Sequence, residues 1–197
     1  MNIQLGDKPR PQLSLGPAAP SLSLGRAHEA TGPAAQVFAA LIAGRLTGPV
    51  LWLRRAWERE ALSPEGLLPF FDPARLVVAA CPRPLDILWS AEEALRSGAA
   101  PFVIAEVAEP PSLTPLRRLQ LAAETGGTLA KRPPLCLLLP PRAGSAGAVE
   151  SRWFCRPIAS WAHGQPASWR FERAYGKSGP PLTWDIAAPE AAALRAA

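Results

Sequence analysis

One segment of the sequence has the layout of a nucleotide-binding loop but lacks the side chains with which such a loop binds. Gly32-Pro33 follows a run that is expected to form a strand and precedes a run that is expected to form a helix. A phosphate-binding loop reads Gly, four residues, then Gly-Lys-[Ser/Thr]; the Lys reaches the phosphates and the hydroxyl binds Mg²⁺. Counted from Gly32, those last three positions hold Val37, Phe38 and Ala39. The segment therefore predicts a nucleotide-binding type of fold without the groups that hold the phosphates.

Alternating strands and helices must position this segment. Apolar runs predict strands at 26–30, 50–53, 76–80, 102–105 and 135–139. Helices are expected at 34–43, at 84–97 with Gly98 as the stop, and from Thr114 to the glycine pair 126–127. After Pro140, alternating runs predict antiparallel strands at 153–156, 169–174 and 182–186. The sequence thus predicts an α/β fold, a mostly parallel sheet with helices on both faces and an antiparallel C-terminal extension.

The chain length of 197 residues suits one domain with short appendages. Residues 1–24 carry two copies of Leu-Ser-Leu-Gly separated by Pro-rich sequence, and we expect them to form a flexible N-terminal segment. The folded domain is expected to span residues 25–187, with the antiparallel strands within about 150–187. Residues 188–197 are expected to form an Ala-rich tail.

Composition narrows the class of protein only partly. The formal net charge of +5 fits a nucleic-acid partner, an acidic protein partner or merely a basic surface. The three cysteines are far apart and form no Cys-x-x-Cys pair, so we expect no metal site and a reducing compartment. No run approaches 18 apolar residues, and we therefore expect a cytoplasmic protein without membrane spans.

Three pairs of basic residues are candidates for a face that contacts DNA phosphates. They are Arg54-Arg55 (with Arg59), Arg117-Arg118 and Lys131-Arg132. The aromatic rings of Trp57 and Trp161 are candidates for stacking on bases. The alternative interpretation is a set of solvated surface charges. Trp89 is expected in the core, whereas Trp153, Trp169 and Trp184 are expected to pack along one face of the extension, with a protein-docking surface as the alternative.

Gln12-Leu13-Ser14-Leu15 resembles the short peptide with which bacterial proteins dock on the replicative sliding clamp, except that Gly16 replaces the usual aromatic residue. The alternative for these residues is an ordinary linker. No Ser, Cys or carboxylate is paired with His28 or His163 in a way that predicts nucleophilic or acid–base catalysis.

Several segments carry a resemblance to a known family. They are His28-Glu29 before Gly32-Pro33, residues 63–67 leading to 72–76, Leu88-Trp89-Ser90-Ala91-Glu92-Glu93-Ala94-Leu95-Arg96-Ser97-Gly98, residues 117–124, and the C-terminal Arg152-Trp153 and Trp184-Asp185. With these segments the chain resembles the RecA-like ATPase core and, more closely, the ImuA family, a bacterial factor of DNA-damage mutagenesis. The similarity covers roughly residues 24–187, and it implies a RecA-like fold.

The resemblance also locates the parts of the ATPase machinery. In RecA-like enzymes a carboxylate after the second strand orients the attacking water, and here Arg55 stands in that region. The carboxylate that supports the metal has a counterpart in Glu106, which alternatively is a solvated strand end. Val37 and Phe38 are expected to fill the space that an enzyme leaves for phosphate. We therefore expect a protein that binds no nucleotide or other cofactor and catalyses no hydrolysis.

The function implied by this resemblance is a non-catalytic adaptor in SOS-induced translesion synthesis. Its implied partners are an ImuB-like homologue of Y-family polymerases and an error-prone subunit of the polymerase III alpha type, with RecA and the sliding clamp as further candidates. The location would be cytoplasmic, and nucleoid-associated when recruited. The alternatives are a weak ATPase that uses Glu106, a DNA-binding subunit that uses the basic pairs, and a SulA-like inhibitor of cell division.

Overall fold

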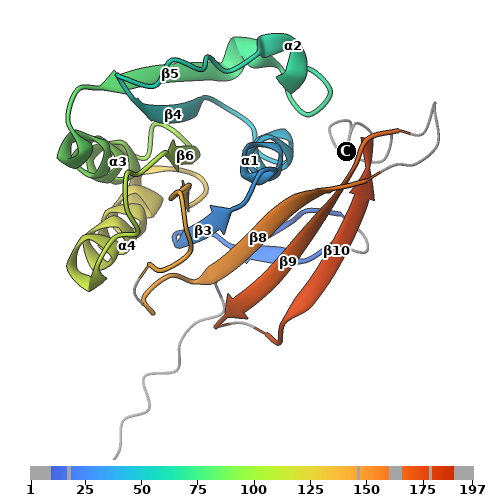
Figure 1. The fold of residues 1–197 in the computed structure, drawn as a ribbon. Helices are drawn as coiled ribbons and strands as arrows, with labels where there is room; N and C mark the ends of the chain where they lie inside the picture. Colours follow the sequence, from blue (N-terminus) through green and yellow to red (C-terminus); the bar gives the residue numbers. More distant parts are fainter. Residues whose placement is uncertain (1–9, 17–18, 146, 160–165, 178, 189–197) are drawn as a thin grey trace, which may run out of the picture.

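The computed structural model describes residues 10–16, 19–145, 147–159, 166–177 and 179–188. Within this part an eight-stranded sheet runs through the molecule, with helices on both faces (Figure 1). Its strands are β3 (Ala27–Thr31), β4 (Val50–Arg55), β5 (Leu76–Cys81), β6 (Phe102–Ala105), β7 (Leu135–Leu138), β8 (Ser151–Ile158), β9 (Ser168–Gly176) and β10 (Leu182–Ala187).

The strand order confirms the expected RecA-like α/β fold. The strands lie in the order β10-β9-β8-β3-β7-β6-β4-β5. From β8 to β5 every neighbouring pair is parallel, whereas β9 is antiparallel to both β8 and β10. The antiparallel extension continues the main sheet past β8, so both parts share one core. The carboxyl ends of the parallel strands meet at one edge of the sheet, where α/β proteins bind their ligands.

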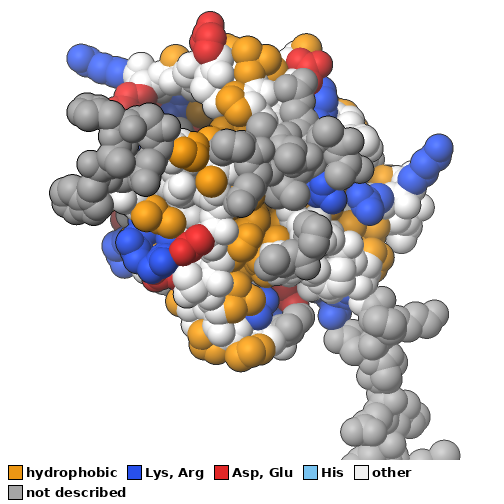
Figure 2. All heavy atoms as spheres, turned by 90° about the vertical axis from the view of Figure 1, so that its right-hand side faces the viewer, with side chains coloured by type: hydrophobic (Ala, Val, Ile, Leu, Met, Phe, Trp, Pro, Cys, Tyr) orange, Lys and Arg blue, Asp and Glu red, His pale blue; other side chains and the backbone are white. Residues whose placement is uncertain are grey.

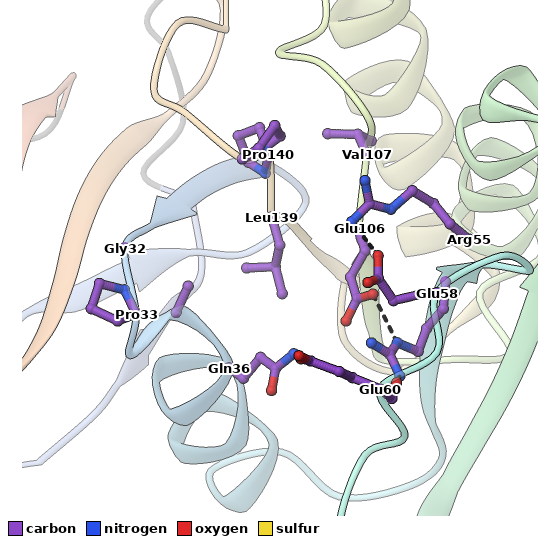
Figure 3. A pocket seen from close by; sticks show the side chains of 13 residues that line it. Gly32, Pro33, Gln36, Arg55, Glu58, Glu60, Glu106, Val107, Leu139 and Pro140 are labelled. Carbon is purple, nitrogen blue, oxygen red and sulfur yellow. Dashed lines mark hydrogen bonds and ion pairs between the residues drawn. The ribbon is translucent and has the colours of Figure 1, made fainter.

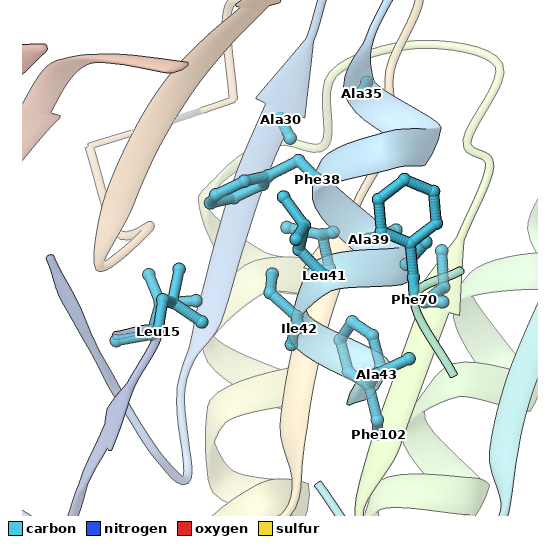
Figure 4. Packing of buried hydrophobic residues seen from close by; sticks show 14 of the residues in the cluster. Leu15, Ala30, Ala35, Phe38, Ala39, Leu41, Ile42, Ala43, Phe70 and Phe102 are labelled. Carbon is cyan, nitrogen blue, oxygen red and sulfur yellow. The ribbon is translucent and has the colours of Figure 1, made fainter. Parts of the chain in front are cut away.

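Helix α1 (Ala35–Gly44) covers one face of the sheet and is hydrophobic nearly all round, as a buried helix must be. Phe38, Ala39 and Ile42 of this helix are fully buried against the sheet (Figure 4). The ring of Phe38 lies 5.1 Å from that of Trp153 and 5.0 Å from that of Phe171. This aromatic cluster joins α1 to the C-terminal extension.

The opposite face is covered by two longer helices, α3 (Pro84–Ser97) and α4 (Leu113–Leu129). Ile87, Ala91 and Leu95 of α3 are fully buried against the sheet and follow one another at every fourth residue. The backbone of α3 ends at Gly98 with φ +65°, the left-handed conformation that favours glycine at a helix stop. A short helix, α2 (Pro64–Leu67), begins after Ser63, whose hydroxyl caps it, and η1 (Pro73–Arg75) leads into β5.

Residues 10–24 differ from the flexible segment that the sequence predicts. The described part forms a small antiparallel sheet of β1 (Gln12–Ser14) and β2 (Ser21–Ser23). Its apolar side chains are buried in the same core as α1: Leu13, Leu15, Leu22 and Leu24. The repeated Leu-Ser-Leu alternates apolar and polar residues, which is the pattern of a strand with one buried face. The folded domain therefore begins before residue 25.

Two expectations about α3 and α4 are also wrong. Helix α4 does not end at the glycine pair but continues to Leu129. Gly126 is there because a Cβ at this position would lie 1.9 Å from the carbonyl oxygen of Leu95. The side chain of Trp89 is not in the core but is 62% exposed. Residues 189–197 lie outside the described residues, as does Trp161.

Candidate functional site

A cavity of about 320 Å³ opens at the carboxyl edge of the sheet, where the sequence predicts the degenerate loop. Four segments line it: the loop and first turn of α1, the end of β4 with the residues that follow it, the residues after β6, and the residues after β7 (Figure 3). Gly32, Pro33, Arg54, Arg55 and Glu106 are all among the lining residues. The structure thus brings together the candidate residues from three separate parts of the sequence.

Packing rather than a ligand accounts for the glycine of the loop. Gly32 has φ +93°, and a Cβ there would lie 2.3 Å from the carbonyl oxygen of Cys155 in β8. The same oxygen accepts a hydrogen bond from the backbone N–H of Ala34 at 3.1 Å. The loop is therefore held against β8, and α1 begins directly after it, at Ala35.

Val37 and Phe38 do not fill the space of the missing phosphates, contrary to the expectation. Phe38 and Ala39 point into the core, and Val37 lines a separate apolar cavity between α1 and α2. Successive side chains of a helix point about 100° apart, so only part of α1 faces the cavity at the loop. The lining residues from α1 are Ala35 and Gln36. The cavity stays open, and its chemistry depends on the ends of β4 and β6.

Both carboxylate oxygens of Glu106 are occupied. Oε2 accepts a hydrogen bond from Arg54 Nε at 2.8 Å, and Oε1 accepts one from Trp52 Nε1 at 2.9 Å. Trp52 and Arg54 share one face of β4 because side chains alternate along a strand. Leu53 pairs with Ala105 in the neighbouring β6, which places Arg54 beside Glu106. Glu106 is thus a buried member of an ion pair, and its alternative interpretation as a solvated strand end is wrong.

The remaining charges of the cavity come from the last residue of β4 and from the chain that follows it. Arg55 pairs with Glu58, and Arg54 also donates to the carbonyl oxygen of Glu60. Arg55 Nε is buried and has no hydrogen-bond partner in the described part of the chain. The lining holds three carboxylates and two guanidinium groups, so its formal charge is one negative. A negative lining disfavours a nucleotide phosphate, which carries the same sign of charge.

The basic pairs do not form one face. Arg54 is buried in its ion pair and Arg55 is half-buried, whereas Arg59 is exposed at the same edge. Lys131-Arg132 precedes β7 and therefore lies at the opposite edge of the sheet, and Arg117-Arg118 lies on the outer surface of α4. On the face shown in Figure 2, Lys and Arg side chains stand in several separate places between hydrophobic and acidic ones. The three pairs therefore do not make up one common face, and contact of any single pair with DNA stays a prediction.

The segment that resembles a clamp-binding peptide is built into the fold. Leu13 and Leu15 are 3% and 0% exposed, so neither apolar side chain is accessible to a partner. Gln12 Nε2 donates a hydrogen bond to Ser23 Oγ at 3.0 Å, across the small sheet. In this structure Leu13 and Leu15 pack in the core of the domain. The hypothesis of a clamp-binding peptide fails because these two leucines, which would contact the clamp, are buried.

A buried polar network links this small sheet to the main one, and the sequence analysis missed it. Ser151 Oγ lies 2.6 Å from His28 Nδ1 and accepts a hydrogen bond from Trp153 Nε1. The hydroxyl proton therefore points to Nδ1, and the N–H at Nε2 donates to the carbonyl oxygen of Ser23. Burial lowers the pKa of His28 to about 4, so the imidazole is neutral. This pair touches no described cavity and stabilises the fold; the parallel register of β3 and β8 brings the two residues together.

The fold and the site define a RecA-like α/β domain without the Lys and the Ser/Thr of a phosphate-binding loop. No protein-family model matches the chain. The protein ImuA of two Caulobacter vibrioides strains is 35% identical to it, and the match covers 86% of this chain and 78% of that protein. The chain therefore belongs to the ImuA family, and it has a DNA-damage-related role of the ImuA type.

Among solved structures, SulA from Pseudomonas aeruginosa is similar, with a TM-score of 0.43 and 20% identity over 57% of this chain and 97% of SulA. No helix in the described part of the chain is long and apolar enough to cross a membrane.

Proposed function

We propose that this chain is a non-catalytic adaptor that acts in SOS-induced translesion synthesis through contacts with other proteins. The observation that carries the proposal is the ion pair of Arg54 and Glu106 in the cavity where a RecA-like enzyme would hold Mg-ATP. Each oxygen of this carboxylate accepts a hydrogen bond, one from the guanidinium and one from the indole of Trp52, so its charge is balanced within the protein. The loop offers no Lys to the phosphates either.

Phosphoryl transfer depends on positioning and electrostatic stabilisation, so losing these groups together removes the reaction. The fold is held at this edge without a ligand by the ion pairs Arg54–Glu106 and Arg55–Glu58 and by the contact of its loop with β8. What remains available for function is the outer surface. Resemblance to ImuA implies an ImuB-like polymerase homologue and an error-prone polymerase III alpha-type subunit as the proteins that it contacts, with RecA as a further candidate.

The test uses a variant that blocks the cavity and leaves the core intact. Gln36 is exposed at the cavity and lies on the first turn of α1, so Gln36→Trp should fill the space without breaking a buried contact. We expect damage-induced mutation frequency in cells to be unchanged by Gln36→Trp. We also expect calorimetric titration of the wild-type protein with Mg-ATP to give no binding heat up to millimolar concentration.

A nucleotide-dependent protein would behave in the opposite way. Micromolar binding of Mg-ATP, or loss of mutagenesis in a folded Gln36→Trp variant, would reject the proposal. ATP turnover that Glu106→Gln abolishes would support the weak ATPase instead. The circular dichroism spectrum of each variant serves as the control for folding.

A further inference from the structure

The strand β5 ends the main sheet on one side, and its outer edge is open. It is the last strand in the sheet order and pairs with β4, at the top of Figure 1. Val77 and Val78 are 52% and 51% exposed, and Ala80 is exposed as well. Because neighbouring side chains of a strand point to opposite faces, the two valines leave apolar surface on both faces of the sheet at this edge.

The hydrogen bonds of β5 show which of its main-chain groups lack a partner. The carbonyl oxygen of Cys81 accepts a hydrogen bond from the N–H of Ala56, which directly follows β4. In a parallel pair the N–H and C=O of one residue point to the same side, and those of the next residue point to the other side. Cys81 and every second residue before it therefore bond to β4, whereas the N–H and C=O of Val78 and Ala80 point outward. Within the described part of the chain these outward groups have no hydrogen-bond partner.

The sequence of β5 does not protect this edge. Exposed edge strands usually carry a charge, a proline or a bulge that keeps other strands away. Residues 76–81 hold no charged residue and no proline, and their register with β4 is regular throughout. At the other end of the sheet, by contrast, β10 carries Asp185, whose side chain is 44% exposed. The row of free main-chain groups on β5 fits an added strand, which supplies donors and acceptors at the matching spacing.

This strand is complementary to a second copy of itself in the antiparallel direction. Its outward-pointing residues are Leu76, Val78 and Ala80. A two-fold axis at Val78 places the two copies of Val78 opposite each other and each Leu76 opposite Ala80. On the other face of the sheet, Val77 then stands opposite Ala79. Every cross-strand pair is apolar, and the exposed valines of the two copies cover one another.

The main-chain groups and the charges fit the same arrangement. The two copies of Val78 exchange their N–H and C=O groups as an antiparallel pair does. The N–H of Ala80 reaches the free C=O of Leu76, whose own N–H is bonded within the chain to the carbonyl oxygen of Pro73. Each end of β5 is flanked by one cation and one carboxylate, so the antiparallel arrangement brings no net charges together: Asp72 and Arg75 before the strand, Arg83 and Asp86 after it.

We propose that a second copy of this chain pairs with β5, antiparallel and about a two-fold axis at Val78, so that two sheets join into one. A contact between identical surfaces closes with two copies and leaves no further edge of this kind open. The proposal goes beyond the proposed function, because it concerns the assembly of the chain and not the cavity at the carboxyl edge. A dimer of this form presents every other outer surface of the chain twice.

The experiment measures the mass of the full-length chain by sedimentation equilibrium over a range of micromolar concentrations. We expect the wild type to dimerise. Val78→Lys places two ammonium groups opposite each other and should raise the dissociation constant at least roughly tenfold, and Val78→Glu should do the same. An equal mixture of these two variants should dimerise again, because Lys then faces Glu. Leu121→Lys is the matched control, since Leu121 is 62% exposed and lies on α4; it should leave the dimer unchanged.

A further variant tests the main-chain groups. Val78→Pro removes an N–H that the described part of the chain does not use, and proline is accepted on an edge strand where the N–H faces solvent. The variant should therefore fold and be monomeric. The circular dichroism spectrum of each variant serves as the control for folding.

Other outcomes overturn the proposal. They are a monomeric wild type, which would leave β5 free for a strand of another protein, a dimer that folded Val78→Lys and Val78→Pro variants still form, and a Lys/Glu mixture that stays monomeric. Failure here is distinguishable from failure of the proposed function, which is decided by the titration with Mg-ATP and by Gln36→Trp. A monomer that binds no nucleotide keeps the adaptor and rejects the dimer alone.

Discussion

Arg54 Nε donates a hydrogen bond to Glu106 Oε2 at 2.8 Å, and their side chains are 11% and 9% exposed. This pair ties the end of β4 to the end of β6. The carboxylate for which the resemblance predicts a metal-supporting role thus balances the charge of an arginine in the same domain. Removing one member of such a pair leaves the other as an uncompensated buried charge, which costs more than the pair itself contributes.

We therefore expect Glu106→Ala to lower the free energy of unfolding by about 3 kcal/mol. Glu58→Ala is the control, because the ion pair of Glu58 with Arg55 is more exposed, and its loss should cost less than about 1 kcal/mol. Urea denaturation measures both. In the double variant Arg54→Met/Glu106→Leu most of the loss should be recovered. Equal losses in Glu106→Ala and Glu58→Ala would show that the buried pair has no special weight.

His28 predicts a fall in stability on acidification. Its pKa is lowered from 6.5 to about 4 because burial disfavours the imidazolium, so between these values the unfolded chain binds more protons than the folded one. The stabilising contribution is complete above pH 6.5 and is lost as the pH falls towards 4, by about 3 kcal/mol in all. The free energy of unfolding as a function of pH, compared between wild type and His28→Gln, isolates it. Parallel curves for the two proteins would contradict the prediction.

The leucines of the small N-terminal sheet should stabilise the whole domain. Leu15 is fully buried, and Leu15→Ala should lower the free energy of unfolding by about 3 kcal/mol through lost burial and the cavity left behind. Ser14→Ala, one position earlier, changes an exposed side chain and should cost less than about 1 kcal/mol. Thermal and urea denaturation of both variants give the comparison. A Leu15→Ala protein as stable as wild type would contradict this prediction and support a flexible N-terminal segment instead.

Replacing Gly126 by alanine should change the stability of the protein in the direction opposite to that usual for a helix glycine. In an ordinary helix interior, Gly→Ala stabilises by about 1 kcal/mol. Gly126→Ala should instead destabilise, because its Cβ would collide with the Leu95 carbonyl oxygen and push α3 and α4 apart. Gly147→Ala is the control, since apart from its chain neighbours no described residue has an atom within 4 Å of the Cβ that it would add. Stability is measured by denaturation, and a stabilised Gly126→Ala variant would show that the helices separate without cost.

The parallel core of the fold was predictable from sequence because its strands are apolar runs between helix and turn signals. The alternation of apolar and polar residues within 153–186 likewise predicted the antiparallel strands of the C-terminal extension. The stop of α3 at Gly98 follows from a local rule and was predicted. These features depend on residues that are close in sequence, where pattern and propensity act directly.

The errors concern contacts between distant residues. The glycines of α4 looked like a helix stop because only the packed partner, Leu95, shows why they are needed. Trp89 recurs with the helical period of a core residue. However, the period does not show which of two neighbouring faces of α3 packs against the sheet. The pairing of Arg54 with Glu106, and of His28 with Ser151, depends on strand order, which the sequence does not state.

The core on the α1 side joins distant parts of the chain: Leu13 of β1 and Leu15, which directly follows β1, pack in one cluster with Trp184 and Ile186 of β10. During synthesis the leucines leave the ribosome first, and their partners follow after some 170 residues, on the order of ten seconds later. Until then the core around these leucines, which α1 and the earlier strands begin to build, lacks the side chains of β10. The N-terminal strands therefore reach their final packing only after β10 has been made, and before that they are less protected from proteases.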